Sequence, residues 1–164
     1  MLKAEQLENV KREMKRNNLK MLGLTGVRWN ETGDVSSDKY RVILSRGQQS
    51  RRGVELVLVP TVGQSVSEVE RTSDRIMRMR MRGTRMDIVV IVVNMPTADY
   101  EDEDVVEVYE QEEDEIRKGR GDGLITVMGD LSAVVGEQGE KDVAGKHGLG
   151  HKNDRGQILL EFCK

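Results

Sequence analysis

The segment 87–97 (DIVVIVVNMPT) constrains the fold more than any other part of the chain, because residues 88–93 are all isoleucine or valine. β-Branched residues favour extended backbone, and an apolar run without alternation indicates a strand that is covered on both faces. A second apolar run, 123–130 (GLITVMGD), follows later in the chain. Both segments are therefore predicted to be central strands of a sheet, with Pro96 marking the exit of the first.

The segment 75–83 (RIMRMRMRG) predicts a third strand with two unlike faces. Methionine and arginine alternate strictly along it: Met77, Arg78, Met79, Arg80, Met81 and Arg82. A period of two places the methionines on one face and the arginines on the other, as in a half-buried strand. The arginine face could track a nucleic-acid backbone, whereas the simpler interpretation is a solvated outer face.

The remaining segments predict a mixed α/β domain. Amphipathic or acidic patterns predict helices at 4–18, 100–118 and 156–163. Apolar runs predict strands at 19–24, 40–45 and 53–60, the last two as an antiparallel hairpin, and 30–38 is predicted to be a loop. This order predicts a single domain over 1–164 with antiparallel neighbours in its first half, which argues against a plain Rossmann winding.

Composition and motifs exclude several classes of protein. The net charge of −3 combines a basic segment, 71–85, with an acidic one, 99–115, so overall charge does not indicate nucleic-acid binding. Cys163 is the single cysteine, which excludes an intramolecular disulfide and a CxxC metal pair. The chain has no GxGxxG or Walker A motif. It also has no apolar run typical of a signal or a membrane span, which predicts an intracellular protein of the nucleus or cytoplasm with no membrane partner.

Polar residues end both predicted central strands. Asn94 ends the first strand, and Asp130, followed by Ser132, ends the second. If the strands are neighbours, these residues share one edge of the sheet, where open α/β folds usually bind ligands. A carboxylate in that place can coordinate Mg²⁺ or orient a water for attack on phosphorus. Alternatively, Asp130 is an ordinary turn or capping residue.

Six blocks in this order carry a resemblance to a known family. They are LENVKREMKRNNLKMLGLTGVRW, RRGVELVLV, TSDRI, MPT, MGDLSAVVG and GKHGLGHKNDRGQILLEFC. Together they resemble the endonuclease/exonuclease/phosphatase family, in particular the endonuclease region of RTE-type non-LTR retrotransposons and a host-gene relative of it. The resemblance implies a two-layered β-sandwich flanked by helices, and Mg²⁺-dependent cleavage of phosphodiester bonds.

The resemblance also implies site residues, several of which differ here. The metal-binding Glu of the family falls at Gly26, which has no side-chain oxygen, and the Tyr of the family falls at Asn94. The Asp is kept as Asp130, while its Asn partner becomes Ser132. Arg28, beside this site, could contact phosphate. No metal ligand is assigned, although the resemblance implies Mg²⁺ as cofactor.

Further family elements fall outside 1–164. The family has an initial strand with an Asn before the first helix and an Asp–His pair after the last block, and the expectation is a truncated sandwich lacking its first strand and its C-terminal strands. His147 and His151 do not align with the family His and are expected to be exposed loop residues.

These observations predict a degenerate endonuclease-like domain that is weak or inactive. The candidate catalytic residues are Asp130, Ser132 and Asn94, and the candidate nucleic-acid-binding residues are Arg28, Arg78, Arg80 and Arg82. The alternative is a non-catalytic module that binds nucleic acid or protein. Its expected partners are DNA, or a protein that covers exposed sheet edges.

Overall fold

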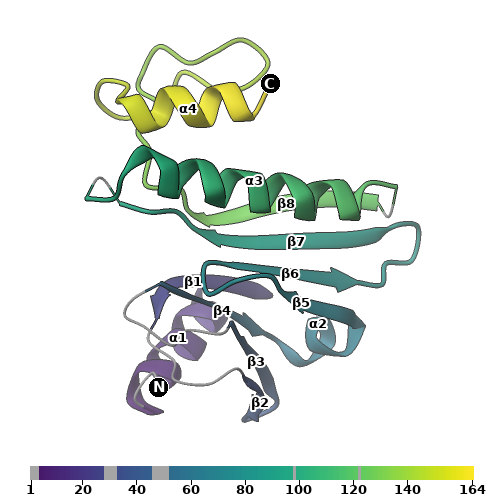
Figure 1. Ribbon diagram of the computed structural model, residues 1–164. Helices are drawn as coiled ribbons and strands as arrows, with labels where there is room; N and C mark the ends of the chain where they lie inside the picture. Colours follow the sequence, from purple (N-terminus) through teal and green to yellow (C-terminus); the bar gives the residue numbers. More distant parts are fainter. Residues whose placement is uncertain (1–3, 28–32, 46–51, 98, 122) are drawn as a thin grey trace. The chain divides into compact units, whose positions relative to one another are not determined.

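The computed structural model describes residues 4–27, 33–45, 52–97, 99–121 and 123–164 (Figure 1). The chain divides into two compact units, one of Met1–Asn94 with Glu110–Asp130 and one of Met95–Tyr109 with Leu131–Lys164. The single domain over 1–164 stays a prediction. The first unit contains all eight described strands, in two four-stranded sheets.

Sheet A has the strand order β1-β4-β3-β2, and all its neighbours are antiparallel. Its strands are β1 (Met21–Val27), β2 (Gly33–Ser37), β3 (Tyr40–Leu44) and β4 (Gly53–Leu58). The predicted hairpin is confirmed by the pairing of β3 with β4. A short helix, α2 (Pro60–Ser65), follows β4.

The prediction of a loop over 30–38 is wrong for 33–37, which form the polar strand β2, while residues 30–32 lie outside the described residues. β2 and β3 are joined by Asp38 and Lys39, whose φ angles are 47° and 73°. Two consecutive residues with positive φ make the tight turn that suits the twist of a hairpin. A strand with little apolar content is tolerated here because β2 is an edge strand of the described sheet.

Sheet B has the order β5-β6-β7-β8 and is mixed. Its strands are β5 (Val66–Arg71), β6 (Ile76–Met81), β7 (Asp87–Asn94) and β8 (Gly123–Asp130). β7 pairs antiparallel with β6 and parallel with β8, and the helix α3 (Asp102–Gly119) makes the crossover that a parallel pair requires.

The predicted central position is confirmed for β7 and wrong for β8. β8 is the last strand of sheet B within the described residues, and Leu124 on it is 54% exposed. A short apolar run identifies a strand, but it does not reveal how many neighbours that strand has. The number of neighbours depends on which other segments reach its second edge.

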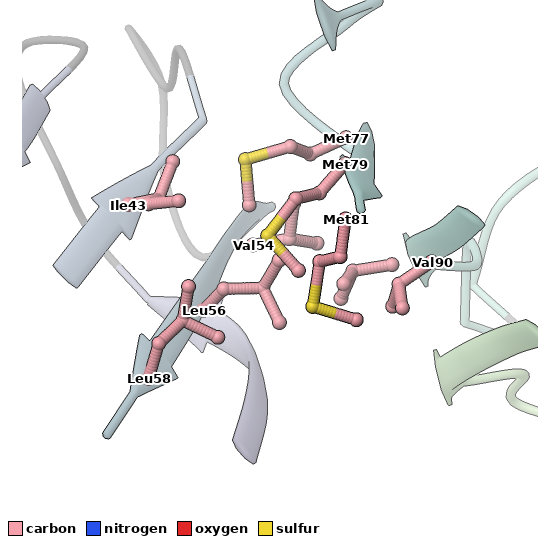
Figure 2. Close-up of a cluster of buried hydrophobic side chains, with 9 residues drawn as sticks. Ile43, Val54, Leu56, Leu58, Met77, Met79, Met81 and Val90 are labelled. Carbon is pink, nitrogen blue, oxygen red and sulfur yellow. The ribbon is translucent and has the colours of Figure 1, made fainter. Parts of the chain in front are cut away.

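Methionine and aliphatic side chains from both sheets fill the interior of the sandwich. Figure 2 shows Met77, Met79 and Met81 pointing towards side chains of sheet A. The buried cluster consists of Ile43, Val54, Leu56, Leu58, Met77, Met79, Met81, Val90 and Val92. Burial of each such side chain contributes about 1.5–3 kcal/mol relative to exposure. The predicted methionine face of β6 is therefore confirmed.

The predicted first helix is confirmed as α1 (Ala4–Arg16), which covers the other face of sheet A. Met14 is fully buried against Val42 and Val57, and Leu7 and Val10 pack against the same cluster. Leu7, Val10 and Met14 therefore form the contact face of this helix. The spacing of 3 and 4 residues between them places them on one side.

The second unit contains the start of α3, the glycine-rich segment and α4 (Asp154–Phe162), which confirms the last predicted helix. Asn153 caps α4, because its Oδ1 accepts hydrogen bonds from the backbone N–H of Gly156 at 2.8 Å and of Val134 at 3.0 Å. The rings of Tyr109 and Phe162 lie 4.7 Å apart between centroids, which attaches the start of α3 to α4.

Candidate functional site

Asn94 and Asp130 are direct partners in the parallel register of β7 and β8. Both strands run in the same direction, so their polar last residues meet at one edge of sheet B. The sequence predicted this adjacency on the condition that the strands are neighbours, and the register confirms it. The catalytic roles proposed for the two residues stay predictions.

Asn94 is buried, and its polar groups are engaged with the protein. Its Nδ2 donates to the carbonyl oxygen of Arg52 at 3.0 Å. Its backbone carbonyl accepts from Nη1 of Arg75 at 2.9 Å, and its backbone N–H donates to the carbonyl oxygen of Arg75 at 2.9 Å. These bonds connect the end of β7 to the start of β4 and to the β5–β6 connection. The Asn94 side chain therefore stabilises the local fold.

Gly26 lies in β1, where the register with β4 shifts between Thr25 and Val27. Its φ is 69°, in the left-handed region that L-residues other than glycine adopt at a cost of about 1–2 kcal/mol. The position therefore differs in two ways from what the resemblance implies. It lacks the carboxylate, and its backbone conformation disfavours a glutamate side chain.

Asp130 is exposed at the end of β8, directly after Gly129. A Cβ on Gly129 would lie 1.9 Å from the carbonyl oxygen of Val93, so only glycine allows β8 to pair with β7 at this point. This contact accounts for the first glycine of the MGDLSAVVG block. Ser132 belongs to the second unit, where its φ is 47° and its Oγ donates to the carbonyl oxygen of Met95 at 3.3 Å.

The prediction of a solvated arginine face is wrong for Arg78, whose side chain is only 7% exposed. Its Nε donates to Glu115 Oε2 at 2.8 Å and its Nη2 donates to Glu68 Oε1 at 2.9 Å. Glu115, on α3, is fully buried and also accepts from Lys118 Nζ at 2.6 Å. Arg78 is thus part of a buried ion cluster with Glu68 and Glu115. A nucleic-acid phosphate could bind Arg78 only by displacing these two carboxylates. We therefore exclude Arg78 from the proposed nucleic-acid-binding surface.

The electrostatics of this cluster favour the charged forms. Burial raises the pKa of the Glu115 carboxyl group, but hydrogen bonds from Lys118 and Arg78 outweigh burial and hold its pKa below the ordinary value. Burial lowers the pKa of Arg78, and its carboxylate partners Glu68 and Glu115 raise it overall. Sequence reasoning missed this cluster. The sequence does contain a signal for it. Glu112 and Glu115 follow Val105 and Val108 at spacings of four and three residues, which places all four side chains on the same side of the helix.

The other predicted nucleic-acid contacts have different environments. The Arg80 side chain is 27% exposed, and its Nε lies 3.6 Å from Glu68 Oε2. Arg82 is exposed at the end of β6. Arg28 lies outside the described residues. Of the predicted arginines that the structure describes, Arg82 is the one freely accessible to a ligand.

The described residues do not fit a Mg²⁺ site of the kind that the resemblance implied. In the described ranges, no group of three or more His, Cys, Asp or Glu side chains is placed to hold a metal ion. Asp130 offers a carboxylate, but Gly26 offers no side-chain oxygen and Asn94 donates its amide to Arg52. His147 and His151 are both exposed in the glycine-rich segment, as predicted.

The fold of the chain is similar to that of a solved structure. Two face-to-face sheets with flanking helices match the crystal structure of TDP2 from C. elegans with a TM-score of 0.56, 14% sequence identity, and coverage of 80% of this chain and 44% of that chain. The sequence identity is low, so this likeness concerns the fold alone. No protein-family model matches the sequence.

The chain is homologous to craniofacial development protein 2, which confirms the resemblance carried by the six blocks. It is 32% identical over 159 residues to the protein from Bos taurus, covering 96% of this chain and 27% of the relative. It is 31% identical over the same length to the protein from Tragulus javanicus, covering 96% and 28%. The chain thus spans about a quarter of the length of these curated relatives. Among its described helices, none has the length and apolarity needed to span a bilayer.

Proposed function

We propose that this chain is a degenerate endonuclease-like domain of retrotransposon origin. Its ancestors hydrolysed phosphodiester bonds of DNA with Mg²⁺, and the chain itself is weak or inactive in that reaction. The observation that carries the proposal is Gly26, which replaces the metal-binding Glu and has a backbone conformation that a Glu disfavours. The homology to craniofacial development protein 2 supports the ancestry.

The physical argument rests on electrostatic stabilisation of the transition state. A metal ion offsets the charge that develops on the phosphoryl oxygens, and loss of a single stabilising group typically costs on the order of 10²–10³ in rate. Asp130 keeps a carboxylate at the edge of sheet B, and its neighbour Asn94 is held by Arg52 and Arg75. Among the described residues, one carboxylate next to an engaged amide does not supply the group of ligands that a Mg²⁺ site of this kind needs.

The test is Mg²⁺-dependent nicking of supercoiled and abasic-site DNA by the purified chain and by Asp130→Ala. We expect both proteins to nick at the background rate, with no difference between Mg²⁺ and EDTA. Glu137→Ala is the matched control, because Glu137 is an exposed carboxylate of the glycine-rich segment. Strong Mg²⁺-dependent nicking that Asp130→Ala abolishes and Glu137→Ala preserves would overturn the proposal.

The alternative is a non-catalytic module that binds nucleic acid. Arg82 and Arg85 favour it, because both are exposed in the segment that follows β6. The exchange of both for Ala should weaken salt-dependent DNA binding, whereas Arg117→Ala, on the exposed side of α3, should not. Absence of measurable binding at low salt would reject this alternative. If DNA binding is rejected, the remaining form of the alternative is a module that binds another protein along β8, where Leu124 is exposed.

A further inference from the structure

Two glutamates are buried on the side of α3 that faces sheet B. Glu112 and Glu115 are 2% and 0% exposed, and they lie one turn apart. Gly119 continues the same side of the helix, and a Cβ there would lie 3.4 Å from side-chain atoms of Val89 and Ile125. The spacing of three and four residues therefore directs Glu112 towards the sheet as well. Buried glutamates are rare in proteins unless they are paired.

The two carboxyl groups differ in their partners. Glu115 accepts from Arg78 at 2.8 Å and from Lys118 at 2.6 Å. Glu112 Oε2 is buried without a hydrogen-bond partner among the described residues. Burial alone raises the pKa of Glu112 to about 7, whereas the cations around Glu115 hold the pKa of that group low. One helix face thus carries a paired carboxylate and an uncompensated one.

The charged groups on the elements packed against this face are already engaged with other partners. On β6, Arg78 pairs with Glu68 and Glu115, and Arg80 lies near Glu68. On α3 itself, Lys118 pairs with Glu115. β7 and β8 present apolar side chains to the helix around Val89 and Ile125. No cation offsets the ionised form of Glu112 within the described part of this face.

We propose that protonation of Glu112 controls how firmly the Glu110–Gly119 part of α3 docks on sheet B, so that the helix is held tightly when the carboxyl group is neutral and loosens when it ionises. An ionised carboxylate without a partner in this face pays the desolvation penalty of a buried charge. A loosened helix returns that charge to water. The proposal is independent of whether the chain cleaves DNA.

The direction of the pH effect follows from linkage. The pKa of Glu112 is about 7 in the docked state and near 4.5 when the group is solvated, so the docked state binds the proton more tightly. Docking is therefore strongest at and below about pH 4.5, weakens as the pH rises towards 7, and changes little above that. The opening equilibrium constant should increase by up to about tenfold per pH unit within this window.

Loosening of α3 is expected to affect β8, the strand that follows it. α3 connects β7 to β8, and a Cβ added at Gly119, at its end, would lie 3.4 Å from side chains of both strands. Loosening of the helix uncovers apolar side chains of β7 and β8, including Val89 and Ile125. The strand that carries Asp130 is therefore held more firmly as the pH falls from about 7 towards 4.5.

Amide hydrogen exchange of residues 110–119 between pH 5 and 8, corrected for intrinsic exchange rates, tests the proposal. We expect opening of this segment to increase with pH in the unmodified chain and to be nearly independent of pH in Glu112→Gln, whose amide stays neutral. Glu113→Gln is the matched control, because Glu113 is the neighbouring residue and is 61% exposed. It should keep the pH dependence of the unmodified chain.

A direct titration covers the case in which Glu112→Gln fails to fold. The ¹³C shift of the Glu112 carboxyl group in the unmodified chain should titrate near pH 7. A midpoint near 4.5 would overturn the proposal, as would a Glu112→Gln variant that retains the full pH dependence of exchange. Loss of this dependence in Glu113→Gln as well would also overturn it, because the effect would then not belong to the buried group.

Discussion

Sheet B carries polar side chains in two places that differ in how the fold uses them. On the face towards α3, Arg78 and Glu115 are buried and form direct ion pairs. At the end of the parallel strand pair, Asn94 is buried and bonded to backbone, while Asp130 is exposed. The charges at the first place hold the helix on the sheet. The groups at the second place are those that we propose to descend from a catalytic site, and Asn94 stabilises the fold there. Four changes test this contrast.

The largest effect is expected for Arg78→Ala. It leaves the buried carboxylate of Glu115 with Lys118 alone, and loss of one partner of a buried ion pair typically costs about 3–5 kcal/mol of unfolding free energy. Urea denaturation measures the change. Arg82→Ala is the control and should stay within about 0.5 kcal/mol.

A double substitution tests the same ion cluster in case Arg78→Ala does not fold. Replacing Arg78 by Met and Glu115 by Leu removes both charges, and such replacements are often close to neutral in stability. A loss below about 1 kcal/mol in Arg78→Ala alone would contradict the role assigned to this cluster.

The second effect concerns the strand ends. Asn94→Ala removes the donor to the carbonyl oxygen of Arg52, and an unsatisfied buried polar group costs about 1–3 kcal/mol. Asp130→Ala, at the adjacent exposed position, should change the unfolding free energy by less than about 0.5 kcal/mol. Equal costs for the two substitutions would show that Asp130 has a structural role that its exposure does not reveal.

The third effect concerns Gly26, the position at which we propose that a metal ligand was lost. Gly26→Glu should lower stability by about 1–2 kcal/mol because φ is 69° there, and it should not restore Mg²⁺-dependent nicking. Gly26→Ala separates the backbone cost from that of the carboxylate and should be similarly destabilised. Nicking gained by Gly26→Glu would mean that this one position had disabled the site.

The smallest effect is expected at the partly exposed pair of Arg41 and Asp34, which lie 2.7 Å apart. The hydrogen bond from Arg41 holds the pKa of Asp34 below its ordinary value, so its stabilisation is present above about pH 3.8 and is lost as the pH falls. Asp34→Asn should cost about 0.2–1 kcal/mol at neutral pH and less at acidic pH. A cost equal to that of Arg78→Ala would show that burial is not what separates the two regions.

The sequence by itself determined most of the elements and suggested the replacements at the proposed ancestral site. The unbroken isoleucine and valine run of β7 and the alternating methionines of β6 identified those strands, because side-chain periodicity is a local property. The glycine at position 26 and the serine at position 132 differ from the residues that the resemblance carried by the six blocks implies.

Only the tertiary structure decided how distant segments meet. It placed β8 at an edge of the described sheet, gave β2 a partner despite its polar sequence, and bonded Asn94 to Arg52. It also turned a predicted solvated arginine into a buried partner of Glu115, 37 residues away in the chain. A local pattern gives the direction of a side chain, whereas its partner depends on which segment covers that face. The partner is therefore fixed only when the whole chain has packed.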